Sequence, residues 1–99
     1  NFGPDNNSVK TVQDTVELAV REWGGPVEWE SANDNHLHEA TLLHLNSDKA
    51  QSMLGWKPYI DFDKAVRETI SWYRKFYSNN QDLKKLTLDQ LIEYENIHD

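Results

Sequence analysis

The second half of the chain carries a stripe of apolar and aromatic side chains at helical spacing. Residues that recur every three or four positions share one side of a helix, and here they are Phe62, Ala65, Val66, Thr69, Ile70, Tyr73, Phe76 and Tyr77. Asp61 stands immediately before the first of them. The spacing therefore predicts a helix from residue 61 to residue 77 whose apolar side belongs to the core of the fold.

Two shorter helices are expected before this stripe. Ser8 has the side chain of an N-cap, and it precedes an apolar pattern that runs to Trp23 and stops at Gly24-Gly25-Pro26. Ser47 has the same role before a second, short helix. Gly55 follows that helix at the position where a left-handed residue commonly ends one.

The remaining pattern predicts two strands and a last helix. Residues 27–30 alternate apolar and polar side chains, which is the period of a half-buried strand, and residues 41–45 fit a second short strand. Thr87 and Gln90 have the spacing of a capping box, which predicts that a short final helix starts there. The expected fold class is therefore α+β, a small helix-rich domain with short strands.

Length and composition restrict the classes of function. A chain of 99 residues forms one small domain. Its 17 acidic and 10 basic residues give a net charge of −7, which argues against binding the phosphates of a nucleic acid. Without cysteine there is no disulfide framework and no thiolate zinc site. No apolar run approaches the roughly 20 residues that span a bilayer, so the expected location is the cytoplasm.

Few residues suggest catalysis or cofactor binding. His36, His38 and His44 lie close to Glu39 in the sequence, but their spacing is not that of a helical or hairpin zinc motif. We therefore prefer to interpret them as exposed polar residues. Gly24-Gly25 follows a helix and does not link a strand to one, as a phosphate-binding loop would. We predict no catalytic, cofactor-binding or metal-binding residue in this chain.

Several short motifs together resemble one group of enzymes. They are Asn1-Phe2-Gly3-Pro4, His38-Glu39-Ala40, Lys49-Ala50, Leu54-Gly55-Trp56, Pro58 and Leu86-Thr87-Leu88-Asp89-Gln90. Over nearly its whole length the chain is similar to the carboxyl-terminal domain of extended short-chain dehydrogenase/reductase enzymes that modify nucleotide sugars. Within that superfamily it resembles most the CDP-glucose 4,6-dehydratase family.

This resemblance implies part of a lyase that uses NAD. In the family, a Rossmann domain with a Tyr-x-x-x-Lys motif oxidises the sugar at C4, eliminates water across C5 and C6, and returns the hydride to C6, on the way to the deoxysugars of surface polysaccharide. These 99 residues contain neither that motif nor a Rossmann glycine motif, so they are not expected to be catalytic alone. Residues 1–80 would form the substrate-binding lobe, and residues 81–99 its carboxyl-terminal helical tail.

The resemblance also implies where the nucleotide sugar binds. Glu39 lies ten positions before the Lys-Ala pair, where related dehydratases hold the ribose hydroxyls. A carboxylate can accept hydrogen bonds from both hydroxyls of a diol. His36 lies three positions earlier, where relatives have an arginine that reaches phosphate. Because an imidazole offers fewer donors than a guanidinium, His38 is an equal candidate. The predicted substrate-binding residues are Glu39, His38 and His36, and the alternative is that all three belong to an exposed loop.

CDP-glucose is the expected ligand, and the sequence leaves GDP-mannose and dTDP-glucose open. The full-length enzyme is expected to be a homo-oligomer, and these residues alone a monomer or a weak dimer; neither nucleic acid nor membrane is an expected partner. A hypothesis from a different class is a free-standing module that binds a basic protein through its acidic surface. A longer reading frame that encodes a glycine-rich turn and a Tyr-x-x-x-Lys motif would decide between the two.

Overall fold

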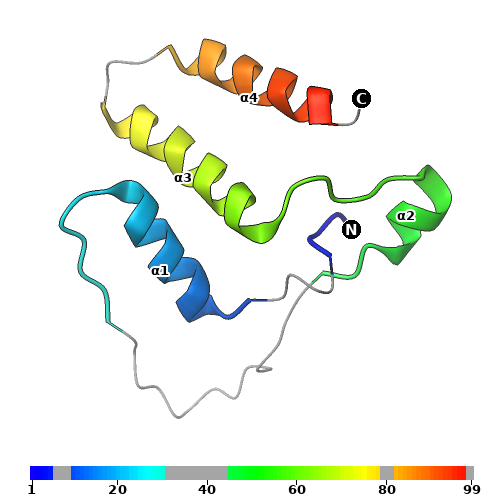
Figure 1. The fold of residues 1–99 in the computed structure, drawn as a ribbon, viewed down its shortest axis with the longest axis horizontal. Helices are drawn as coiled ribbons and strands as arrows, with labels where there is room; N and C mark the ends of the chain where they lie inside the picture. Colours follow the sequence, from blue (N-terminus) through cyan, green and yellow to red (C-terminus); the bar gives the residue numbers. More distant parts are fainter. Residues whose placement is uncertain (6–9, 31–44, 79–81, 98–99) are drawn as a thin grey trace.

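The computed structural model describes residues 1–5, 10–30, 45–78 and 82–97, which contain four helices. They are α1 (Val12–Trp23), α2 (Asp48–Leu54), α3 (Phe62–Ser78) and α4 (Leu83–Ile97). Helices α1, α3 and α4 lie side by side, and α2 lies apart from them, near the amino terminus (Figure 1). The expected helix at residues 61–77 is confirmed as α3.

The expectation of an α+β fold is wrong, because the described residues contain no strand. Residues 27–30 are irregular and all four are exposed, including both Val27 and Trp29. A short strand needs a partner for its backbone hydrogen bonds, and no strand of the described chain lies beside this segment. Of the second expected strand, residues 41–44 lie outside the described residues, and Leu45 is not in a strand.

Helix α1 begins later than expected, with Thr11 and not Ser8 as its N-cap. The Thr11 hydroxyl accepts a hydrogen bond from the Asp14 backbone N–H at 3.1 Å, and the Asp14 carboxylate accepts one from the Thr11 N–H at 3.0 Å. This reciprocal pair is a capping box. Gly24 ends the helix as expected, with φ at +77°.

The capping box makes the start of α1 sensitive to acid. Hydrogen bonds from the backbone N–H and the side chain of Thr11 lower the pKa of Asp14 below its ordinary value. A lowered pKa in the folded state means that the stabilisation is present above the ordinary pKa and is lost as the pH falls through the lowered one. We expect an NMR titration of the Thr11 amide to show this low pKa. Thr11→Ala should bring it closer to the ordinary value and cost about 1 kcal/mol of unfolding free energy, whereas Thr69→Ala should not change it.

Helix α2 is also ended by a glycine, as expected. Gly55 has φ at +64°, and its N–H donates to the Gln51 carbonyl at 3.1 Å. At the other end, Ser47 is the N-cap residue, but its side chain makes no capping bond. The side chain of Asn46 accepts from the Asp48 N–H at 2.9 Å instead. Ser47 is buried, as is Ala50.

Helices α3 and α4 form an antiparallel pair. Trp72 Nε1 donates to Thr87 Oγ1 at 2.9 Å, and Lys64 Nζ lies 2.8 Å from Glu93 Oε1. Between these two contacts, Gln90 Nε2 donates to both the backbone carbonyl and the carboxylate of Glu68, at 3.0 and 2.8 Å. As the residue number rises along α3, the number of its partner on α4 falls, so the two helices run in opposite directions.

The expected capping box at Thr87 and Gln90 is wrong, because both residues lie inside α4. The helix starts one turn earlier, where Asp82 Oδ1 accepts from the Lys85 N–H at 3.1 Å. Thr87 Oγ1 donates to the Leu83 carbonyl at 2.7 Å and also accepts from α3. The two polar residues therefore hold α4 on α3 and do not start a helix.

Gln90→Glu is expected to loosen α4 from α3. The new carboxylate would replace a donor amide that lies 2.8 Å from the Glu68 carboxylate, and both acceptors of Glu68 would lose their donor. We expect a loss of about 1–3 kcal/mol at neutral pH, partly recovered at acid pH when one carboxyl is protonated. Urea unfolding at two pH values measures this. Gln13→Glu, which places a new charge beside Glu17 on the exposed side of α1, should change stability by only about 0.5 kcal/mol.

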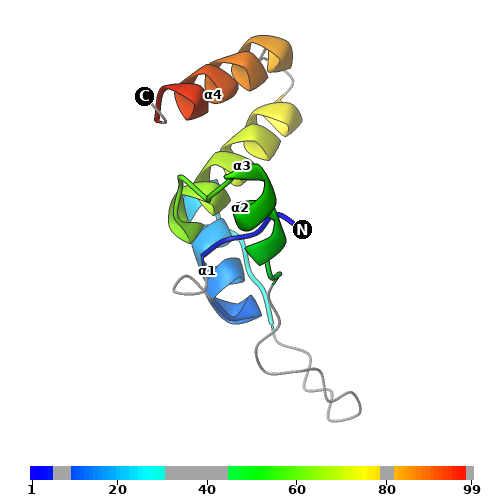
Figure 2. The same ribbon diagram turned by 90° about the vertical axis from the view of Figure 1, so that its right-hand side faces the viewer.

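The three long helices form a single layer, which Figure 1 shows face on and Figure 2 from the side. A single layer has no second layer to cover its faces. Consequently Leu18 and Ala50 are the buried apolar residues of the described chain. The apolar residues in the first half of the α3 stripe are half-buried, but Thr69, Tyr73, Phe76 and Tyr77 are exposed. The expectation that the whole stripe is core is therefore too strong.

None of the described helices combines the length and the apolar character that a membrane crossing requires.

Candidate functional site

The predicted substrate-binding residues Glu39, His38 and His36 lie within residues 31–44, outside the described residues. Their predicted role therefore stays a prediction. His44 lies in the same segment. Among the described residues, no group of three His, Cys, Asp or Glu side chains is placed to hold a metal ion.

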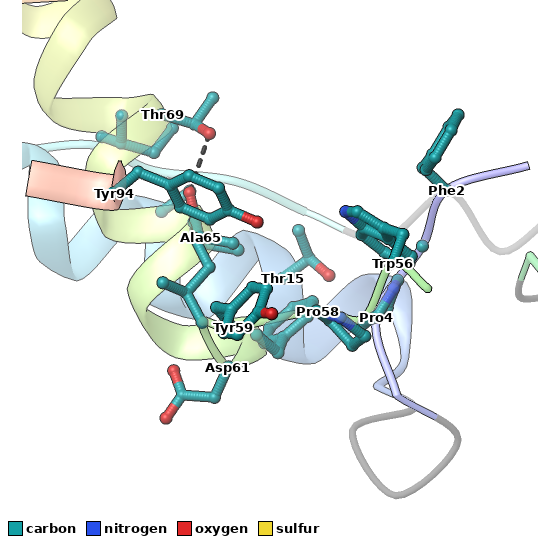
Figure 3. A pocket seen from close by; sticks show the side chains of 16 residues that line it. Phe2, Pro4, Thr15, Trp56, Pro58, Tyr59, Asp61, Ala65, Thr69 and Tyr94 are labelled. Atoms are coloured by element: carbon teal, nitrogen blue, oxygen red, sulfur yellow. Dashed lines mark hydrogen bonds between the residues drawn. The ribbon is translucent and has the colours of Figure 1, made fainter. Parts of the chain in front are cut away.

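A cavity with a volume of about 550 Å³ lies where four segments of the described chain meet. These are the amino-terminal residues 2–4, helix α1, residues 56–61 together with the first half of helix α3 that follows them, and the end of α4 (Figure 3). Most of the side chains that line it are apolar or aromatic, and they include Phe2, Pro4, Ala19, Trp56, Pro58, Tyr59, Ile60, Phe62, Ala65, Val66, Ile70 and Tyr94.

Aromatic pairs hold the walls of this cavity together. The rings of Phe2 and Trp56 meet edge to face with centroids 5.1 Å apart, which joins the amino terminus to the segment after α2. The rings of Tyr59 and Tyr94 meet in the same way at 6.3 Å, which joins that segment to α4. Lys57 Nζ lies 5.3 Å from the centroid of the Tyr59 ring, a cation–π contact.

The polar side chains at the cavity serve the helices nearby. Thr15 Oγ1 donates to the Thr11 carbonyl at 3.0 Å, and Thr69 Oγ1 donates to the Ala65 carbonyl at 2.8 Å (Figure 3). Asp61 Oδ1 accepts from the Lys64 N–H at 2.8 Å and so caps α3. With these groups used locally, the cavity offers an apolar, aromatic surface that suits packing or ring stacking and not acid–base chemistry.

An ion pair between Lys64 and Glu93 joins α3 to α4 beside a smaller cavity, which shares Ile60 and Tyr94 with the aromatic one. The hydrogen bond and the charge of Glu93 raise the pKa of Lys64. Within α4, Asp89 Oδ2 lies 2.7 Å from Lys85 Nζ, and its hydrogen bond and charge raise the pKa of Lys85 in the same way. Both pairs are exposed, so each contributes little to the stability of the fold.

The residues from Leu54 to Pro58, which carry part of the resemblance, have several different surroundings. Gly55 is the confirmed helix end. Trp56 is half-buried and lines the cavity together with Pro58. Leu54 is exposed. Sequence reasoning missed the cavity itself, although the resemblance had already singled out Phe2 and Trp56.

Comparison with known proteins places the chain among sugar-nucleotide dehydratases. It is 31% identical over 94 residues to CDP-glucose 4,6-dehydratase of Salmonella typhimurium, covering 95% of this chain and 26% of that protein. It is 29% identical over 80 residues to dTDP-D-glucose 4,6-dehydratase of Mus musculus, covering 78% of this chain and 22% of that protein. No family model and no solved structure matches the chain.

The chain thus spans about a quarter of the length of these curated relatives. Both matches fall in the carboxyl-terminal part of the relative. The confirmed resemblance explains why motifs from the first residue to Gln90 point to one group of enzymes. The chain is a domain of the nucleotide-sugar 4,6-dehydratase family, corresponding to the carboxyl-terminal part of its members.

Proposed function

We propose that this chain forms the nucleotide-sugar-binding lobe of a CDP-glucose 4,6-dehydratase, a lyase of the cytoplasm. The observation that carries the proposal is the match of 94 residues, almost the whole chain, to a CDP-glucose 4,6-dehydratase. The shorter match, to a dTDP-D-glucose enzyme, shares the reaction type in its name but differs in the nucleotide. CDP-glucose is therefore the first substrate to test.

Glu39 is the residue proposed to bind the ribose of that substrate, with His38 or His36 toward the phosphates. These residues lie on the segment between Glu30 and Leu45. Leu45 lies next to the amino terminus, because a side chain at Gly3 would come within 2.9 Å of Leu45 Cβ. Leu45, the first described residue after this segment, therefore lies beside the amino-terminal residues that line the aromatic cavity.

The described residues do not fit a dinucleotide cofactor. A dinucleotide loop places glycines between a strand and the start of a helix. Here Gly24 and Gly55 lie at the ends of helices, Gly3 packs against Leu45, and Gly25 lies against Trp23. The NAD of the proposed reaction would accordingly be bound outside these 99 residues, together with the catalytic groups.

The test is the reaction itself, carried out with the product of the whole reading frame that encodes these residues. Supplied with NAD and CDP-glucose, it is expected to release one water per sugar and to form the 4-keto-6-deoxy product, which mass spectrometry detects. dTDP-glucose and GDP-mannose are the comparison substrates. Conversion of one of them in preference to CDP-glucose would reassign the base. If none of the three is converted, the dehydratase proposal is wrong.

A further inference from the structure

Helix α4 carries a second apolar surface in addition to the one on α3. Leu88, Leu91 and Ile92 are spaced by three and four residues, so they share one side of the helix. They are 47%, 51% and 52% exposed. The residues that contact α3, among them Thr87 and Gln90, lie on another side. We call the three apolar residues the outer stripe of α4.

The outer stripe lies at the free edge of the helix layer. Figures 1 and 2 both show α4 with α3 on one side and no described helix on the other. Each of the three side chains is therefore open to contact with another molecule. Three large aliphatic residues in one exposed row are more than the scattered single residues that a surface normally shows.

Opposite charges stand at the two ends of this stripe. Lys84 lies one turn before Leu88, and Glu95 lies one turn after Leu91. Both side chains are exposed, and within the described residues neither takes part in an ion pair. The row therefore reads basic, apolar, apolar, acidic from the start of α4 to its end.

Two copies of this row that run in opposite directions are complementary to each other, because each basic end then meets an acidic end. In an antiparallel pair centred between positions 89 and 90, Leu88 of one copy faces Leu91 of the other. The same register brings Lys84 of one copy opposite Glu95 of the other, twice, around a two-fold axis. We propose that the outer stripe of α4 is an interface on which a second copy of this chain docks in the antiparallel direction.

The proposed interface is small, so the dimer is weak and reversible. One helix face is well below the roughly 1,200 Å² of total buried surface found in stable complexes. The net charge of −7 on each copy adds a general repulsion, which salt at about 0.15 M largely screens beyond roughly 8 Å. Contacts between Lys84 and Glu95 are local, so they select the register even when long-range repulsion is screened.

Reciprocal charge reversal tests the pairing. Lys84→Glu and Glu95→Lys should each weaken self-association at least about tenfold, because each places two like-charged pairs across the axis. An equimolar mixture of the two variants should recover association through the pairs that remain complementary. Sedimentation velocity over a range of concentrations measures this, and circular dichroism confirms that the variants keep their helices. Leu88→Ser with Leu91→Ser should abolish association.

Lys49→Glu and Glu28→Lys are the matched controls, since they make the same changes of net charge on exposed residues away from α4. They should leave association within about twofold of the wild type. If they weaken it as much as the α4 variants do, net charge and not the stripe governs association, and the proposal is wrong. It is equally wrong if the mixture associates no better than its components, or if the wild-type chain stays monomeric at millimolar concentration.

Cysteine cross-linking tests the direction, because the chain has no cysteine of its own. Lys84→Cys combined with Glu95→Cys should give disulfide-linked dimers on mild oxidation. Lys84→Cys alone should give few, because in an antiparallel pair the two copies of residue 84 lie roughly 16 Å apart at 1.5 Å per residue. Efficient linkage of the single variant would show a parallel pair and overturn the proposed register.

Discussion

Replacing Glu39 with glutamine is expected to weaken the binding of CDP-glucose by about 1–3 kcal/mol in the whole enzyme that contains this lobe. The amide keeps the shape of the side chain, but its NH2 replaces one of the two oxygens that would accept from the ribose diol. A carboxylate near the pyrophosphate also repels it, so Glu39 is useful at such a site only if its hydrogen bonds to the hydroxyls outweigh that repulsion.

Turnover at saturating substrate should fall much less than affinity. The ribose lies away from the reacting carbons of the sugar, so its contact is the same in the ground state and in the transition state. Calorimetric titration with NAD present measures the dissociation constants, and steady-state kinetics measures kcat separately. Glu30→Gln is the matched control, because it makes the same chemical change on an exposed residue just before this segment. Equal dissociation constants for wild type and Glu39→Gln would remove Glu39 from the site.

Helix ends were predictable where one residue could fill the role. Gly24 and Gly55 end their helices as expected, both in the left-handed conformation, and Asp61 caps α3. The start of α1 was ambiguous because Ser8 and Thr11 both precede apolar residues. Thr11 is the cap, and it has an acid three residues later that completes the reciprocal pair. A possible N-cap residue that has no acidic residue three positions later is therefore weaker evidence for the start of a helix.

Local pattern failed where the outcome depended on distant partners. Val27 and Trp29 alternate with glutamates as in a strand, but the pattern contains nothing about whether a second strand lies beside them. Gln90 has the spacing of a cap, yet it bonds to Glu68 on the neighbouring helix. The cavity brings Phe2, Trp56 and Tyr94 together from three distant parts of the chain. No periodicity within one helix could predict that meeting, whereas the resemblance correctly identified the family.

The stability of this layer is expected to depend strongly on Leu18, and Leu18→Ala should lower the free energy of unfolding by about 2–3 kcal/mol. Leu18 is 8% exposed, and with Ala50 it makes up the buried apolar residues of the described chain. Its removal leaves a gap beside Phe62, which lines a smaller cavity with Leu18 between α1 and α3.

Small domains have total stabilities of about 5–15 kcal/mol, and we expect this chain to be near or below the lower limit, since most of its α3 stripe is only partly covered. The variant should therefore lose a large part of its folded population at moderate temperature. Urea unfolding, followed by circular dichroism and by tryptophan fluorescence, measures the difference. The Trp23 ring, one of four tryptophans, has its centroid 6.2 Å from that of Tyr77 on α3, so its share of the fluorescence reports on contact between the two helices. Leu54→Ala makes the same substitution at a residue that is 70% exposed, and it should change stability by no more than about 0.5 kcal/mol. Equal losses in the two variants would mean that α1 does not pack on α3 through Leu18, and the single-layer arrangement would then lose its main internal support.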